Sequence, residues 1–222
     1  MVWQVLFIAI LSYLIGSINP AIILSNLISK EDIRTKGSGN AGTTNTLRTM
    51  GKGPAIAVLL IDVLKAVVAI LLAKWISTFG EYTSEQISSL HDFALMAAGF
   101  GVVLGHNFPV YYGFKGGKGV ATSLGLLLVI EWKIGLICLV FAIVIILVSR
   151  MVSLGSITAA LLYPVLVLLL PGTAFNNNLL YLTFAILLAL LLIIRHRTNI
   201  KRLFNGTENK LWKTKEEKSN LE

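Results

Sequence analysis

The segment GHNFPVYYGFKGGKG, residues 105–119, combines glycines with two lysines immediately before a run of apolar residues. Gly116 and Gly117 let the backbone approach a bound group closely, and Lys115 and Lys118 supply positive charge for an anion. A helix that begins after this segment would direct the positive end of its dipole toward the same anion. The segment differs from a Walker A loop, because its last lysine is followed by glycine instead of Ser or Thr. We therefore predict an anion site here that is not an ATP site.

A second glycine-rich segment, KGSGNAGTTNTLRTMGKG at residues 36–53, carries short polar side chains and no acidic residue. Ser38, Asn40 and Asn45 offer hydrogen-bonding groups, and Arg48 offers a planar fork that can hold a phosphate through two hydrogen bonds. Successive backbone N–H groups in such turns form anion-binding concavities. The combination favours a phosphate site, and a flexible loop with a basic end is the alternative.

Histidines are the candidate acid–base groups. His196 lies between two arginines in RHRTNIKRLFNGTE, residues 195–208, and Asn199 follows three residues later on the same face of a helix. His106 follows a glycine and precedes a proline, so a ligand-binding role and a structural role at a helix end both stay open for it. No group of His, Cys, Asp and Glu has the spacing of metal ligands, so we expect no metal and no cofactor.

One charged pair falls inside an otherwise apolar segment. Asp62 and Lys65 are three residues apart, so they can pair on one face of a helix. A charge within a membrane segment is a functional hypothesis by default, but a paired charge is as often structural. Both roles stay open from the sequence.

All of these polar segments lie in a chain that is 55% hydrophobic and only 14% charged, whereas ordinary soluble domains carry about 25% charged residues. The mean hydropathy is +0.79. Strand-type alternation is absent, so we expect an all-α polytopic membrane protein. Seven apolar segments are candidates for membrane helices; they cover residues 2–27, 54–76, 93–104, 121–131, 134–148, 154–170 and 179–194. The ends of these helices must position the polar segments.

Lys and Arg are distributed unevenly between the loops. Nearly all of the 19 follow an odd-numbered apolar segment or lie in the tail, and the opposite side holds only Lys74 and Lys133. By the positive-inside rule, the C-terminus and the polar segments face the cytoplasm and the N-terminus lies outside. We expect residues 1–198 to form one integral-membrane catalytic domain and residues 199–222 a basic cytoplasmic tail at the membrane interface. Nucleic acid is not an expected partner, because the basic residues do not lie on a soluble domain.

Four segments of the chain together resemble one family, the bacterial acyl-phosphate:glycerol-3-phosphate acyltransferases (PlsY). They are GSGNAGTTNTLR, GHNFPVYYGFKGGKGVATSLG, RMVSLGSI and RHRTNIKRLFNGTE, and the opening YLIGSINP in the first apolar segment agrees as well. The resemblance covers nearly the whole chain, and the glycine–lysine segment is its most specific part. Asn19 departs from the family pattern.

The resemblance implies a reaction. A fatty acyl group would pass from acyl phosphate to the 1-hydroxyl of sn-glycerol 3-phosphate, which yields lysophosphatidic acid and inorganic phosphate in the first acylation of phospholipid synthesis. The implied partners are acyl phosphate, glycerol 3-phosphate, membrane lipid and an enzyme that forms acyl phosphate. The implied location is the bacterial cytoplasmic (inner) membrane, as a multi-pass protein whose active site faces the cytoplasm.

The same resemblance, with the residue patterns above, assigns roles to individual residues. Catalytic roles fall to His196, Lys115 and Asn199. Substrate-binding roles fall to Ser38, Asn40, Asn45, Arg48, His106, Gly116, Gly117, Lys118, Ser153, Ser156 and Glu208. Two choices stay open, namely which lysine is essential and whether His196 or a substrate phosphate oxygen is the general base. No Ser-His-Asp arrangement can be assigned, so no covalent acyl-enzyme is expected.

A transporter or binding protein for a small organic phosphate is the alternative function. Inverted repeats would favour a transporter, and the two halves of the chain show no convincing repeat. A phosphotransferase acting on CDP-alcohols would need an aspartate-rich motif, which the sequence lacks.

Overall fold

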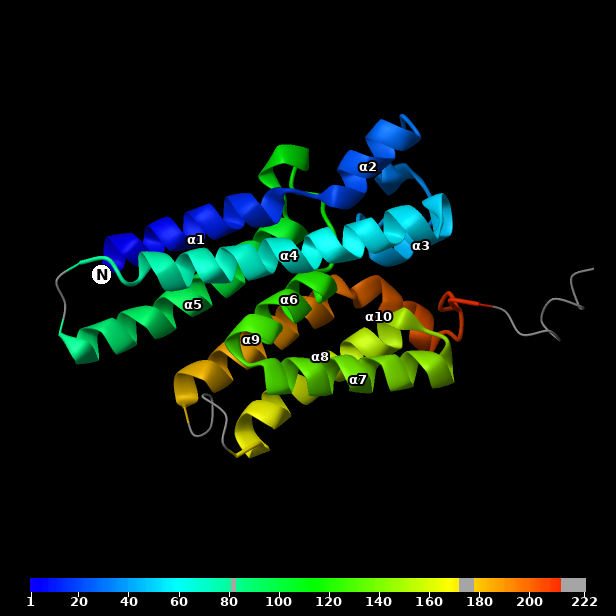
Figure 1. The fold of residues 1–222 in the computed structure, drawn as a ribbon. Helices are drawn as coiled ribbons and strands as arrows, with labels where there is room; N and C mark the ends of the chain where they lie inside the picture. Colours follow the sequence, from blue (N-terminus) through cyan, green and yellow to red (C-terminus); the bar gives the residue numbers. More distant parts are fainter. Residues whose placement is uncertain (81–82, 172–177, 213–222) are drawn as a thin grey trace, which may run out of the picture. The chain divides into compact units, whose positions relative to one another are not determined.

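The computed structural model describes residues 1–80, 83–171 and 178–212, and every regular element within these ranges is a helix (Figure 1). The expected all-α class is therefore confirmed for the described residues. The chain divides into two compact units, Met1–Trp132 and Lys133–Glu222, and each is described by itself below. Residues 213–222 of the expected tail lie outside the described residues.

The first unit is built around three long helices. Its elements are α1 (Val2–Ser17), α2 (Pro20–Ile28), η1 (Ile33–Thr35), α3 (Thr43–Met50), α4 (Lys52–Ile76), α5 (Ser84–Asn107), η2 (Val110–Tyr112) and α6 (Val120–Ile130). Helices α1, α4 and α5 lie side by side, and α6 packs against α4 (Figure 1). The first glycine-rich segment, residues 36–53, forms the loop before α3 and α3 itself, and the second ends where α6 begins.

Small residues bring α1 and α5 into close contact. A side chain added at Gly101 or Gly105 would overlap the carbonyl oxygen of Ala9 or Tyr13. Glycines four residues apart on one face are a common device for bringing membrane helices together. The contact places the end of α5 against the end of α1.

The first apolar segment is broken between Ser17 and Pro20. Pro20 begins α2 and cannot donate a backbone hydrogen bond, and Asn19 caps the new helix by accepting from the N–H of Ile22 at 3.1 Å. Helix α1 therefore ends at Ser17 and leaves its last carbonyl groups to be satisfied by other partners.

The second unit contains the remaining four helices. They are α7 (Trp132–Ser149), α8 (Val152–Leu169), α9 (Leu179–Arg195) and α10 (Arg197–Phe204). Helices α8 and α9 pack against each other, and Ala160, Ala189 and Leu192 form a buried cluster. The axis bends by 64° between α9 and α10, and His196 lies at the bend.

All seven expected membrane segments are helical, but they differ in length. Within the described ranges, five are long and apolar enough to cross a membrane, and a sixth is added if α9 and the bent α10 count as one span. Helix α6 has 11 residues, which extends for about 16 Å at 1.5 Å per residue, roughly half of a hydrocarbon core of about 30 Å. Neither the count of seven complete spans nor the orientation of the termini is confirmed, and both stay predictions.

Candidate functional site

The first glycine-rich loop, residues 36–42, is held in shape by Asn45 of α3. The Asn45 amide oxygen accepts from the N–H of Ser38 at 2.8 Å, and its amide nitrogen donates to the carbonyls of Ile33 and Lys36 at 3.2 and 3.0 Å. The Asn45 side chain is buried, whereas Ser38 is exposed. Asn45, a predicted substrate ligand, therefore binds the loop backbone, and Ser38 lies on the accessible side.

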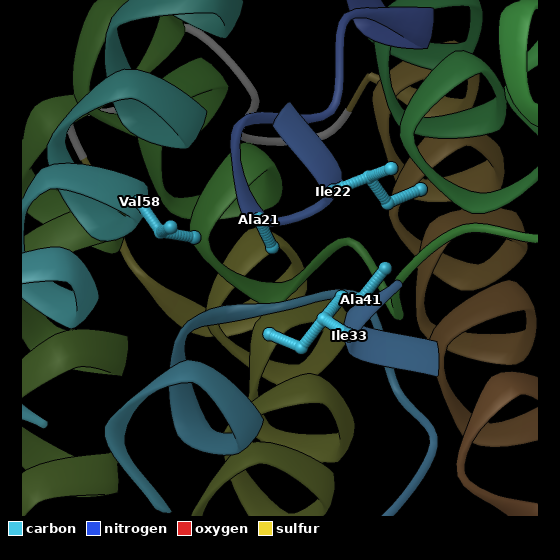
Figure 2. Packing of buried hydrophobic residues seen from close by; sticks show 5 residues of the cluster. All are labelled: Ala21, Ile22, Ile33, Ala41 and Val58. Atoms are coloured by element: carbon cyan, nitrogen blue, oxygen red, sulfur yellow. The ribbon is translucent and has the colours of Figure 1, made fainter. Parts of the chain in front are cut away.

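A small apolar cluster anchors the same loop to the helix bundle. Figure 2 shows Ala41 of the loop beside Ala21 and Ile22 of α2, Ile33 of η1 and Val58 of α4. All five are buried, so they hold the loop against the helices by excluding water.

Asn19 adds a polar connection to this anchor. Its amide nitrogen donates to the carbonyl of Ala41 at 3.3 Å, and the residue is completely buried. Asn19 thus binds the first glycine-rich loop while it caps α2.

The second glycine-rich loop packs directly on His106. The N–H groups of Gly116 and Gly117 donate to the carbonyls of Asn107 and His106 at 3.2 and 3.1 Å. A side chain at Gly116 would overlap the His106 carbonyl oxygen, and one at Gly117 would overlap His106 Nε2. These glycines therefore let the loop lie against His106. Their role in letting the backbone approach a bound anion stays a prediction.

Arg34 holds this second loop from the other side. Its Nη1 donates to the carbonyls of Tyr112 and Lys115 at 2.7 and 3.0 Å. Its Nε donates to both carboxylate oxygens of Asp32, and Nη2 donates to Oδ2. The hydrogen bonds from Arg34 lower the pKa of Asp32, and the same bonds raise the pKa of Arg34. The sequence pattern did not mark Arg34 as a site residue, because its partners in the second loop lie far away in the chain.

A buried polar cluster lies beneath the loop. Asp62 Oδ1 is 2.7 Å from Lys65 Nζ and 3.1 Å from His106 Nδ1. Lys65 Nζ also donates to the carbonyls of Gly16 and Ile18 at 3.0 and 2.9 Å. The pairing of Asp62 with Lys65 is confirmed, and the structure adds His106 and the end of α1 to it.

Glu208 accepts hydrogen bonds from three polar side chains of the second unit. Its Oε1 accepts from Ser153 Oγ at 2.9 Å and from Asn199 Nδ2 at 2.7 Å, and its Oε2 accepts from Arg202 Nε at 2.8 Å. Burial raises the pKa of Glu208, but the hydrogen bonds from Arg202, Asn199 and Ser153 outweigh burial and leave the pKa below its ordinary value. The structure thus brings together three predicted site residues, Ser153, Asn199 and Glu208.

His196 is buried at the bend between α9 and α10, and its tautomer follows from one contact. Nδ1 lies 2.8 Å from the carbonyl oxygen of Leu192. Because a carbonyl oxygen can only accept, Nδ1 carries the proton and Nε2 carries the lone pair when the ring is neutral. Nε2 is therefore the nitrogen able to take a proton in acid–base chemistry.

The remaining predicted site residues differ in their location and exposure. Arg48 lies in the last turn of α3 and is exposed, as is Lys115 in the second loop. Lys118 and Asn40 are partly exposed in their loops. Ser156 is buried and donates to the Val152 carbonyl of its own helix at 2.9 Å, so its hydroxyl supports α8.

The comparison with family models decides the family. The model described as "Glycerol-3-phosphate acyltransferase" matches residues 6–206. The chain belongs to the glycerol-3-phosphate acyltransferase family. Among the predicted site residues of this family member, Glu208 alone lies outside the matched range.

Curated relatives of this glycerol-3-phosphate acyltransferase family member resemble it over nearly their whole length. A glycerol-3-phosphate acyltransferase of Shouchella clausii (strain KSM-K16) is 45% identical over 96% of this chain and 98% of its own length. One of Halalkalibacterium halodurans is 43% identical over 92% and 94%.

Solved structures of PlsY, an integral membrane glycerol 3-phosphate acyltransferase, share the fold. The glycerol 3-phosphate form matches with a TM-score of 0.79 and 35% identity, covering 93% of this chain and 94% of that chain. The lysophosphatidic acid form matches with a TM-score of 0.76. The predicted PlsY family is therefore confirmed, and the chain is an integral membrane protein of this type.

Proposed function

We propose that the chain transfers a fatty acyl group from acyl phosphate to the 1-hydroxyl of sn-glycerol 3-phosphate and releases lysophosphatidic acid and inorganic phosphate. The observation that carries the proposal is the match to the acyltransferase family over residues 6–206. The likeness to PlsY forms named for glycerol 3-phosphate and for lysophosphatidic acid supports the acceptor and the product. The proposed donor implies a separate enzyme that forms acyl phosphate.

The protein's task in this reaction is to position two substrates and to neutralise charge. The hydroxyl oxygen attacks the acyl carbonyl carbon and forms a new C–O bond. Collapse of the tetrahedral intermediate breaks the bond from that carbon to the phosphate oxygen, and phosphate leaves with the electron pair. Cationic groups and hydrogen-bond donors stabilise the oxyanion and the leaving phosphate. Holding the substrates in line supplies much of the remaining acceleration.

Residues of the first unit are proposed to bind the phosphate groups. Ser38 and Arg48 lie on accessible parts of the first loop and of α3, and Lys115 lies on the second loop. Arg48 offers two parallel hydrogen bonds to a phosphate, and Lys115 and Lys118 offer point charges. Asn45, Gly116 and Gly117 shape the loops that carry these side chains.

Residues of the second unit are proposed to serve proton transfer and substrate positioning. The hydroxyl proton passes to Nε2 of His196 or to a substrate phosphate oxygen. Asn199 and Ser153 are candidates to orient the substrate, and Glu208 fixes both of them.

We propose a seven-segment topology in the bacterial cytoplasmic membrane, with α6 as a short segment, the N-terminus outside and the site facing the cytoplasm. The uneven distribution of Lys and Arg supports this orientation. The basic tail, residues 199–222, is proposed to lie at the membrane interface, because Phe204 on α10 is 88% exposed beside basic residues.

A comparison of donors tests the proposed reaction. The full-length purified protein is incubated with glycerol 3-phosphate and one of three donors: acyl phosphate, acyl-CoA or acylated acyl carrier protein. All three donors carry the same acyl chain, and the formation of lysophosphatidate is measured. We expect product only with acyl phosphate. Product formed with acyl-CoA or acyl carrier protein, and none with acyl phosphate, would overturn the proposed donor.

A further inference from the structure

Asp62 and Lys65, to which the proposed acyl transfer assigns no role, form a buried cluster with His106. Asp62 and Lys65 belong to the membrane-spanning part of α4, and His106 belongs to the end of α5. The exposed fractions of the three residues are 1%, 6% and 3%. Ionised groups buried at such depth are costly, so a specific use is the natural hypothesis for them.

The hydrogen bonds of Lys65 determine the orientation of His106. An ammonium group has three protons, and three oxygens surround it, those of Asp62, Gly16 and Ile18, at 2.7, 3.0 and 2.9 Å. No proton of Lys65 is left for His106 Nδ1, although the two nitrogens are 3.0 Å apart. Nδ1 therefore keeps its own proton and donates it to Asp62 at 3.1 Å.

This hydrogen bond fixes the orientation of the His106 ring, so that Nε2 points toward the glycine-rich loops. The opposite ring nitrogen, Nε2, lies where a side chain at Gly117 would stand. The same point is close to the carbonyl oxygen of Ala41 in the first loop. The imidazole thus lies where both glycine-rich loops approach each other, and its tilt decides how closely Gly117 can pack.

Lys65 connects the cluster to the first loop by a second route. Its bonds to the carbonyls of Gly16 and Ile18 satisfy the end of α1, where a cation is also favoured by the helix dipole. The next residue, Asn19, donates to Ala41 of the first loop. A displacement of Lys65 would therefore shift the positions of both glycine-rich loops.

We propose that Asp62 and Lys65 are positioning residues for the acyl transfer. They hold the His106 imidazole and the end of α1, so that the two glycine-rich loops present Ser38, Lys115 and Lys118 to phosphate. His106 then acts through its Nδ1 contact with Asp62 and not as a direct substrate ligand. This inference rests on the proposed function.

Two variants separate positioning from structural support. In Asp62→Asn, the charge of Lys65 is left buried without its partner, so we expect a lower melting temperature and a KM for glycerol 3-phosphate raised about 10- to 100-fold. The double variant Asp62→Asn/Lys65→Met removes both charges. Its melting temperature should return toward that of the wild type, because no unpaired charge remains, but the raised KM should persist. If KM returns together with the melting temperature, the pair is only structural and the proposal is overturned.

Replacing His106 tests which ring nitrogen matters and leaves the ion pair intact. The amide nitrogen of Asn can occupy the place of Nδ1 and donate to Asp62, whereas the longer Gln places its amide at the position of Nε2. We expect His106→Asn to keep KM nearer to the wild-type value than His106→Gln does. The reverse order would show a direct substrate contact by Nε2 and overturn the proposal. If Asp62→Asn does not fold, the two His106 variants still test whether the cluster positions the loops.

Lys74 provides the matched control on the same helix. It is partly buried and donates to the carbonyl of Val129 at 3.3 Å. Lys74→Met should leave KM for glycerol 3-phosphate unchanged. Stabilisation of each variant against heat by added glycerol 3-phosphate gives a second readout that does not depend on turnover. Wild-type protein without turnover would count against the proposed function, whereas active wild type with unaffected cluster variants would count against this inference alone.

Discussion

Arg34 donates to the backbone carbonyl of Lys115 at 3.0 Å and so joins the segment after α2 to the loop that carries a proposed phosphate-binding lysine. The guanidinium holds Asp32 with its remaining nitrogens, which fixes its direction. The backbone of Lys115 is therefore held in place by Arg34, while its side chain is exposed.

Loss of the hydrogen bonds from Arg34 to the second loop should affect substrate binding more than the stability of the fold. We expect Arg34→Ala to raise KM for glycerol 3-phosphate about tenfold, because a freed loop must be ordered again when the phosphate binds. Arg34→Lys should restore little, since an ammonium cannot hold Asp32 and two carbonyls in one plane. Steady-state kinetics with both variants would check this, and an unchanged KM in Arg34→Ala would refute it.

Removing the Asn45 side chain should disturb the first loop. Asn45→Ala leaves the N–H of Ser38 and the carbonyls of Ile33 and Lys36 without this partner. The hydrogen bond to the Ile33 carbonyl is buried. A buried polar group that loses its partner costs about 1–3 kcal/mol, so we expect a lower melting temperature together with a raised KM. Thr49→Val is the control, because the Thr49 hydroxyl only donates to its own helix; it should change neither quantity.

Acid should weaken the second unit through Glu208. Its pKa in the folded protein lies below the ordinary value of 4.5. The stabilisation that it provides is therefore complete above about pH 4.5 and is lost as the pH falls through the lower, folded pKa. Thermal unfolding between pH 7 and pH 3, compared for wild type and Glu208→Gln, should show a steeper acid loss in the wild type. Parallel curves would contradict the assignment.

Substitutions of His196 decide which group takes the proton. If Nε2 is the general base, His196→Gln should lower kcat by about 10²- to 10⁴-fold, since an amide cannot accept the proton. If a substrate phosphate oxygen is the base, the same variant should keep most of kcat and change mainly KM. Measuring kcat and KM separately distinguishes the two assignments.

The sequence was sufficient to predict the helical class, both glycine-rich loops and the family, because composition and motif spacing are local properties. It did not predict the contacts that give these loops their shape. His106 and Asp62 are 44 positions apart, and Arg34 and Lys115 are 81 apart, so only the packed bundle brings them together. Asn45 and Gly117 were identified from residue type, but their loop-shaping role depends on the positions of Ile33 and His106. The short sixth helix agrees with its expected segment, since residues 121–131 were predicted and α6 covers Val120–Ile130.

Release of phosphate from acyl phosphate by the full-length protein tests the central claim most directly. Phosphate and lysophosphatidate would be measured together, with and without glycerol 3-phosphate. Direct transfer predicts that phosphate appears only when glycerol 3-phosphate is present and in equal amount to lysophosphatidate. An initial burst of phosphate without the acceptor would instead indicate a covalent acyl-enzyme. Saturable binding of glycerol 3-phosphate with no turnover would contradict the acyltransferase assignment.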